Sequence, residues 1–97
     1  MGLLFDWDQS NRKHVARHQV TPGEAEEVIL NDPVDLEMQT EEGEERLVQL
    51  GETGEGRILI VVTTWRAEKI RVITAFLAPR RLRELYWREK VREREHD

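Results

Sequence analysis

The chain has 97 residues and no cysteine, which suits a single domain and excludes disulfides, Cys-ligated zinc, iron–sulfur clusters and thiol catalysis. No apolar run approaches the roughly 18 residues of a membrane span, and the N-terminus lacks a signal-peptide pattern, so we expect a cytoplasmic protein without membrane contact. The net charge of −5 is unevenly distributed, because residues 21–55 hold twelve acids and one base whereas residues 56–97 hold eleven bases and six acids.

The N-terminal third predicts a short strand followed by two helices. Leu3–Trp7 has the composition of a strand, and Asp8 is a good N-cap for a helix that ends near Gln19. Thr21 caps a second helix that begins at a proline and ends near residue 30. Two consecutive helices therefore precede the rest of the chain.

Four further strands and one helix follow. The pattern of residues 34–39 alternates, as in a half-buried strand, and the apolar run "ILIVV" is typical of a central strand. The remaining predicted elements are strands at 46–52, 57–65 and 69–76 and a helix from Pro79 to about Arg94. This order predicts one α+β domain over residues 1–97, a small antiparallel sheet of about four to five strands with two N-terminal helices and one C-terminal helix packed on it. We expect residues 93–97 to fray.

Two histidines lie on one face of the first helix. His14 and His18 are four residues apart, a spacing that can serve zinc. Zinc needs a third ligand, however, and Arg17 beside the pair is unfavourable for a metal, so we expect no metal and no cofactor. His18 lies near the helix C-terminus, where the helix dipole favours its charged form, and it is a candidate acid or anion contact.

The basic residues form a second candidate set. Arg80 and Arg81 stand in the first turn of the last helix, where cations repel the dipole and an anion would relieve the repulsion. Arg66, Arg71 and Arg80 could converge on a phosphate, or they could pair with the abundant glutamates. Both interpretations stay open on the residues alone. The other candidate phosphate contacts are Arg17, Arg57, Lys69 and Arg81.

The three tryptophans offer weaker signals. Trp7 and Trp65 could stack on bases, but their position among strand residues favours the core or its edge. Trp87 follows the inward-facing Tyr86, so we expect it to be half exposed and suited to a partner surface.

Three stretches together resemble the BrnT family of bacterial toxins. They are "FDWDQSNRKHVARHQVTPGEAEEV", "GEERLVQLG" and "ILIVVTTWRAEKIRVITAFLAPRRLRELY", in the family's order and over about nine-tenths of the chain. The resemblance implies a RelE-like fold and a metal-independent ribonuclease that cleaves RNA and inhibits translation. By position it implies that Arg66, Arg71 and Arg80 are catalytic residues that stabilise the charge on the phosphate. It also implies that the Arg17–His18 pair belongs to the site, with His18 as the candidate proton-transfer group.

The resemblance also implies partners. A cognate BrnA-like antitoxin, with a DNA-binding ribbon-helix-helix or similar domain, would neutralise the chain, typically as two toxins with two antitoxins. Promoter DNA would be bound only through the antitoxin. This sequence departs from the family at Phe76, where an arginine is usual. The alternative is therefore a catalytically weak or inactive toxin-like module that acts as antitoxin partner or co-repressor.

Overall fold

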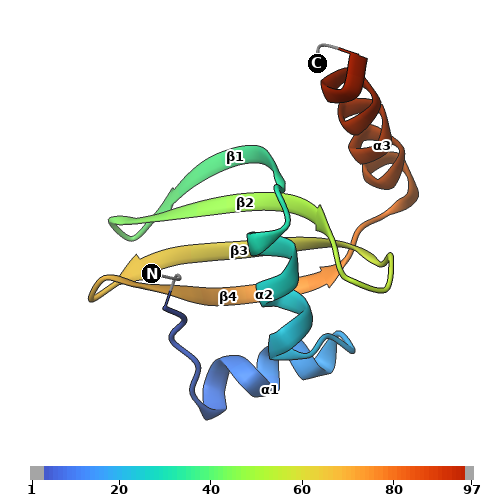
Figure 1. Ribbon diagram of the computed structural model, residues 1–97. Coiled ribbons are helices and arrows are strands. Elements are labelled where there is room, and N and C mark those ends of the chain that lie inside the picture. Colours follow the sequence, from blue (N-terminus) through green and yellow to red (C-terminus); the bar gives the residue numbers. More distant parts are fainter. Residues whose placement is uncertain (1–3, 96–97) are drawn as a thin grey trace.

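The computed structural model describes residues 4–95 as one sheet with three helices (Figure 1). The sheet is antiparallel with strand order β1-β2-β3-β4, so that β1 and β4 are its edges. Its strands are β1 (Val34–Glu41), β2 (Glu44–Glu52), β3 (Ile58–Arg66) and β4 (Lys69–Leu77), and the helices are α1 (Gln9–Arg17), α2 (Pro22–Leu30) and α3 (Arg80–Glu95). The predicted α+β class, with two N-terminal helices and one C-terminal helix, is confirmed.

The two N-terminal helices begin where capping chemistry predicts. The Asp8 carboxylate accepts hydrogen bonds from the backbone amides of Ser10 and Asn11, and the Asn11 side chain accepts one from the amide of Asp8. Thr21 and Glu24 form the same reciprocal arrangement at the start of α2. These bonds satisfy amides that a helix start otherwise leaves unpaired.

The first predicted strand is reduced to a single parallel bridge between Phe5 and Ile70. Two backbone hydrogen bonds hold it, from the Asp6 amide to the Ile70 carbonyl and from the Ile70 amide to the Leu4 carbonyl. The segment cannot extend further along β4, because Asp8 already turns the chain into α1. The part of that prediction at Leu3 lies outside the described residues.

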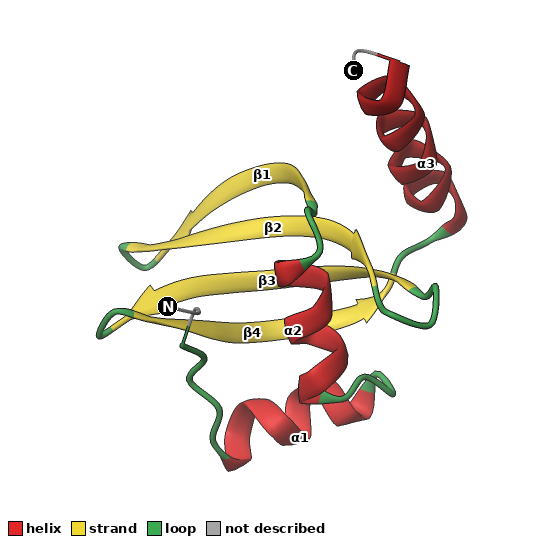
Figure 2. Cartoon of the chain, in the orientation of Figure 1, coloured by secondary structure: helices red, strands yellow, loops and turns green. Residues whose placement is uncertain are grey.

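Apolar residues of the sheet contribute to two cores, one on each face. Figure 2 shows in red the helices and in yellow the strands from which these residues come. On the α1–α2 face the buried cluster consists of Val15, Val20, Ala25, Val28, Leu59, Val61, Val72 and Ala75. On the other face Tyr86 of α3 joins Val48, Leu50, Ile58, Ile60 and Ala78. Strand β3 contributes to both clusters, as its continuous apolar run predicts.

Helix α2 covers only part of its face of the sheet. A Cβ on Gly51 would lie 2.8 Å from Val28 Cγ1, so helix and strand are in close contact there. Towards the opposite end of the strands, Met38 and Trp65 are 57% and 66% exposed. The expectation that Trp65 belongs to the core or its edge is wrong, because no helix extends over this end of the sheet within the described residues.

The C-terminal helix leaves the end of β4 and projects beyond the sheet (Figure 1). Trp87 is 45% exposed, which confirms its predicted half-exposed position. Helix α3 continues to Glu95, so the tail expected to fray is helical as far as that residue, and positions 96 and 97 lie outside the described residues. Within residues 4–95, no helix has the length and apolar character needed to cross a membrane.

Candidate functional site

Helix α1 lies along the free edge of β4 and runs parallel to it. The Asn11 side-chain amide donates hydrogen bonds to the Val72 and Asp6 carbonyls at 3.1 and 2.9 Å. One turn further on, His14 Nε2 shares a hydrogen bond of 3.0 Å with the Thr74 hydroxyl. Asn11 is only 4% exposed, so its bonds form a buried link that fixes the helix on the strand edge.

The two histidines continue this contact towards the end of β4. The His14 and His18 rings lie with their centroids 5.6 Å apart, and the His18 ring lies 5.9 Å from that of Phe76. His18 is exposed, His14 and Phe76 are partly buried, and His18 is the C-cap of α1. The shared helical face predicted for the pair is confirmed, and it places two imidazoles at the rim of the sheet.

The solvent side of α1 is basic. The helix contains no acidic residue, and its exposed cations Arg12, Lys13 and Arg17 have no carboxylate at ion-pair distance within residues 4–95. The Arg12 guanidinium lies 6.0 Å from the centre of the Trp7 ring, a weak cation–π contact. Uncompensated cations beside two imidazoles make this edge a suitable surface for an anion.

The other predicted basic residues divide between the two ends of β4. Arg57 is on the His18 side, because its guanidinium donates to the Gln19 carbonyl at 3.1 Å and pairs with Glu24 at 2.6 Å. Burial acts to raise the pKa of Glu24, but hydrogen bonds from Thr21 and Arg57 outweigh it and leave that pKa lowered. Arg80 and Arg81 also belong to this end, because α3 starts three residues after β4 ends beyond Phe76.

Arg66, Lys69 and Arg71 lie at the opposite end of the strand. Arg66 is directly paired with Lys69 where β3 turns into β4. The nine residues of β4 separate this end from Arg80, which at roughly 3.3 Å per residue is about 25 Å. The expectation that Arg66, Arg71 and Arg80 converge on one phosphate therefore does not hold.

Each of these three arginines also has a carboxylate partner. Arg80 pairs with Glu84 at 3.1 Å, Arg66 with Glu44 at 3.5 Å, and Arg71 with Asp8 at 3.0 Å and Asp6 at 3.5 Å. Only Arg71 is largely buried, with 11% of its side chain exposed. The sequence left open whether these arginines bind a phosphate or pair with glutamates. In this structure all three pair with carboxylates.

Arg71 joins the N-terminal segment to β4. Its hydrogen bond holds the pKa of Asp8 below the ordinary value, assisted by the amide of Asn11, and the same bond to Asp8 raises the pKa of Arg71. Because Asp8 also caps α1, this pair anchors the start of the helix beside β4. These contacts give Arg71 a structural role at the start of the basic edge.

Sequence reasoning did not assign His14, Lys13 or Arg12 to the site, although the spacing of the histidines already placed His14 beside His18. The resemblance to the family drew attention to Phe76, but nothing in the sequence pattern indicated Thr74 as a contact of His14, because that contact depends on which strand edge α1 covers. Within the part of the chain that the structure describes, no three His, Asp or Glu side chains are grouped so that they could hold a metal ion.

Comparison with known families finds a match over most of the chain. Residues 7–81 match the family described as "Ribonuclease toxin, BrnT, of type II toxin-antitoxin system". No individual curated protein matches the sequence closely enough to add to this comparison. The matched residues include α1, α2, the entire sheet and the first two residues of α3, well over half of the sequence. The chain therefore belongs to the BrnT family of ribonuclease toxins of type II toxin–antitoxin systems.

Proposed function

We propose that the chain is a metal-independent endoribonuclease, that it binds and cleaves RNA at the α1–β4 edge, and that an antitoxin neutralises it. The observation that carries this proposal is the pair of imidazoles, His14 and His18, 5.6 Å apart on a helix whose other cations have no carboxylate partner within residues 4–95. In the cytoplasm, cleavage of RNA would inhibit translation, as the resemblance implies.

The chemistry of RNA cleavage matches these side chains. The ribose 2′-hydroxyl attacks the adjacent phosphorus while a base removes its proton, and an acid protonates the 5′-oxygen that leaves. Two imidazoles can supply the base and the acid, because histidine titrates near neutral pH. We assign the proton transfers to His18 and His14 without ordering the two roles.

The charge that develops on the phosphate requires fixed cations. Arg17 is adjacent to His18, and Arg80 and Arg81 lie at the same end of β4, so these three guanidinium groups are the proposed contacts to phosphate. Arg57 is engaged by Glu24 and the Gln19 carbonyl, and in the proposal it supports the edge. Arg66 and Lys69, at the far end, take no direct part, and Arg71 supports α1.

One observation favours the alternative of a catalytically weak toxin-like module that acts by binding its antitoxin. Phe76 contacts His18 at the position where the family usually carries an arginine. A benzene ring cannot stabilise the charge on the phosphate, and the loss of one charge-stabilising group reduces the rate of cleavage by about 10²–10³. The two functions differ in rate, so a measured rate separates them.

The deciding experiment is cleavage of a defined RNA by the purified chain in EDTA. We expect His18→Ala to reduce cleavage by about 100-fold or more, with the Arg66→Ala variant as a matched control that stays within a few-fold of the wild type. Phe76→Arg should raise the rate if Phe76 weakens the enzyme. An equal loss of cleavage in His18→Ala and Arg66→Ala would place the active site elsewhere. If neither the wild type nor Phe76→Arg cleaves RNA, the chain acts only as a module that binds its antitoxin.

A further inference from the structure

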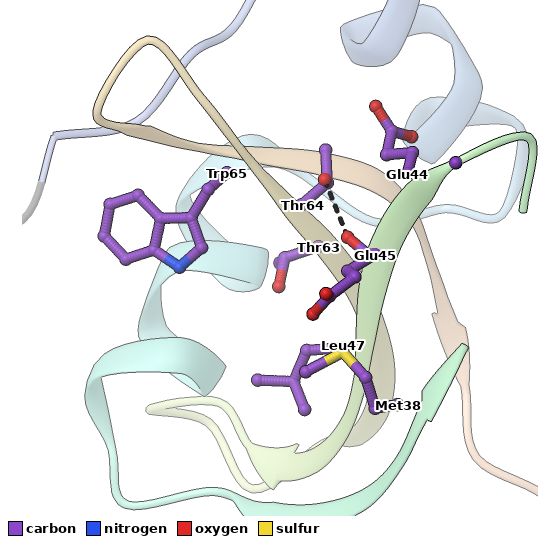
Figure 3. Close-up of a pocket in the computed structure, with 8 residues that line it drawn as sticks. Met38, Glu44, Glu45, Leu47, Thr63, Thr64 and Trp65 are labelled. Atoms are coloured by element: carbon purple, nitrogen blue, oxygen red, sulfur yellow. Dashed lines mark hydrogen bonds between the residues drawn. The ribbon is translucent and has the colours of Figure 1, made fainter. Parts of the chain in front are cut away.

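A groove opens on the α1–α2 face of the sheet, at the end that α2 does not reach. It has a volume of about 540 Å³ and is lined by Met38, Gly43, Glu44, Glu45, Leu47, Thr63, Thr64 and Trp65. Figure 3 shows the side chains of Met38, Leu47 and Thr63, from three adjacent strands, close together, with the Trp65 ring on the same side. The groove is remote from His18, which lies at the other end of β4.

Met38, Leu47 and Trp65 give this groove an apolar surface in contact with solvent, whereas Thr63 beside Leu47 is polar and only 7% exposed. Met38 pairs with Leu47 across β1 and β2, and Leu47 pairs with Thr63 across β2 and β3, so these residues form a row on one face. Trp65 is two positions further along β3 and is 66% exposed. A large aromatic side chain beside an exposed methionine is typical of a surface that a partner covers.

The rim of the groove is acidic. The β1–β2 turn brings four glutamates together within Glu41–Glu45, and Glu68 lies in the neighbouring β3–β4 turn. Arg46 pairs with Glu41 and Glu44. Glu42, Glu45 and Glu68 have no ion pair within residues 4–95. Arg66 and Lys69 lie at this end too, and Arg66 pairs with Glu44. Five glutamates against Arg46, Arg66 and Lys69 still leave an excess of negative charge, which repels RNA and favours a cationic occupant.

We propose that this groove is the docking site for a basic segment of the antitoxin, with an apolar side chain inserted between Met38 and Trp65 and lysines or arginines facing Glu42 and Glu45. The choice of the antitoxin as occupant rests on the proposed function, whereas the location and the chemistry of the segment come from the groove. The negative charge around the groove disfavours an acidic segment, and the apolar side chains of Met38, Leu47 and Trp65 give a basic segment an anchor.

A second exposed apolar surface, on α3, does not specify an occupant. On α3, Trp87 and Val91 are 45% and 51% exposed, but both signs of charge border them, as Arg88, Arg92 and Glu95 show. Because two arginines and one glutamate border it, this surface has no excess of negative charge, and it serves as the matched control for the groove.

The test is calorimetric titration of the full chain with its purified cognate antitoxin. We expect Trp65→Ala to weaken binding by about 30-fold or more, and the Glu42→Lys, Glu45→Lys double variant by about tenfold with a smaller dependence on salt. Trp87→Ala should stay within about threefold of the wild type. The double variant changes only exposed charges, so it tests the groove even if Trp65→Ala proves unstable.

Two results would overturn the proposal. The first is tight antitoxin binding by both groove variants while Trp87→Ala binds poorly, which would place the interface on α3. The second is a change in the oligomeric state of the isolated chain with Trp65→Ala, which would make a second copy the occupant. If the binding pattern is as expected but the chain cleaves no RNA, the groove stands and the ribonuclease proposal fails.

Discussion

Replacement of Asn11 by alanine tests whether the α1–β4 edge is held by the three hydrogen bonds of this one side chain. Its amide group donates to the Asp6 and Val72 carbonyls, and its oxygen accepts from the Asp8 amide at 2.8 Å. The variant loses all three bonds, and because Asn11 is 4% exposed, water has little access to the groups left behind. The expected effect is a loss of stability together with a loosened helix.

The magnitude follows from the bonds. Each contributes about 1 kcal/mol to the free energy of unfolding, and alanine recovers up to about 0.7 kcal/mol through its higher helix propensity. The net loss is about 2–3 kcal/mol, a large share of the roughly 5–15 kcal/mol typical of a whole domain. For a chain of this size, that corresponds to a melting temperature lower by about 8–20 °C.

Thermal unfolding followed by circular dichroism measures this shift, with Ser10→Ala as control because the Ser10 hydroxyl is exposed and makes no hydrogen bond within residues 4–95. Asn11→Asp keeps the hydrogen bond accepted from the Asp8 amide and loses the two donated ones, so its melting temperature should also be lower than that of the wild type. A decrease of less than about 4 °C in Asn11→Ala, about 1 kcal/mol, would show that other contacts hold α1 on β4.

Two further predictions concern stability. The pKa of Asp8 is lowered in the folded chain by its hydrogen bond with Arg71. The stabilising effect of this carboxylate is therefore present above the ordinary pKa of 3.8 and is lost as the pH falls through the lower folded value. The melting temperatures at pH 7 and pH 3 should differ less in Asp8→Asn than in the wild type, and an unchanged difference would contradict this. Gly51→Ala would place a methyl group 2.8 Å from Val28 and should lower the free energy of unfolding by about 1–3 kcal/mol in denaturant titrations. Gly23→Ala, with 3.9 Å to its nearest atom, is its control, and equal stability of the two variants would refute the packing argument.

Most helices and strands could be predicted because their signals are local. The caps at Asp8 and Thr21 are set by side chains within three residues of the helix start, and the apolar run of β3 is continuous. The first strand was predicted too long because its pairing is not local. Only Phe5 bridges to Ile70, and the cap at Asp8 ends the extended segment.

The arrangement of the arginines could not be predicted, because it depends on strand length and on partners far along the sequence. Arg66 and Arg80 are separated by the full length of β4, and the sequence does not show which end of that strand α1 will approach. Arg71 is paired with Asp8, 63 residues earlier. The sequence identified basic residues able to bind phosphate, and only the packing of α1 on β4 indicates which of them lie at the same end of the strand as His18.

The two proposed sites have a consequence for neutralisation. Trp65 in the groove pairs with Ile70, and the His18 imidazole lies beside Phe76, so the two sites are six residues apart along β4, about 20 Å at roughly 3.3 Å per residue. A segment confined to the groove therefore cannot cover His18. An extended chain advances at most about 3.3–3.6 Å per residue, so roughly six further residues are needed to reach the basic edge. An antitoxin that docks in the groove and blocks RNA must follow the sheet with a second segment, and acidic side chains in that segment would match Arg17 and Lys13.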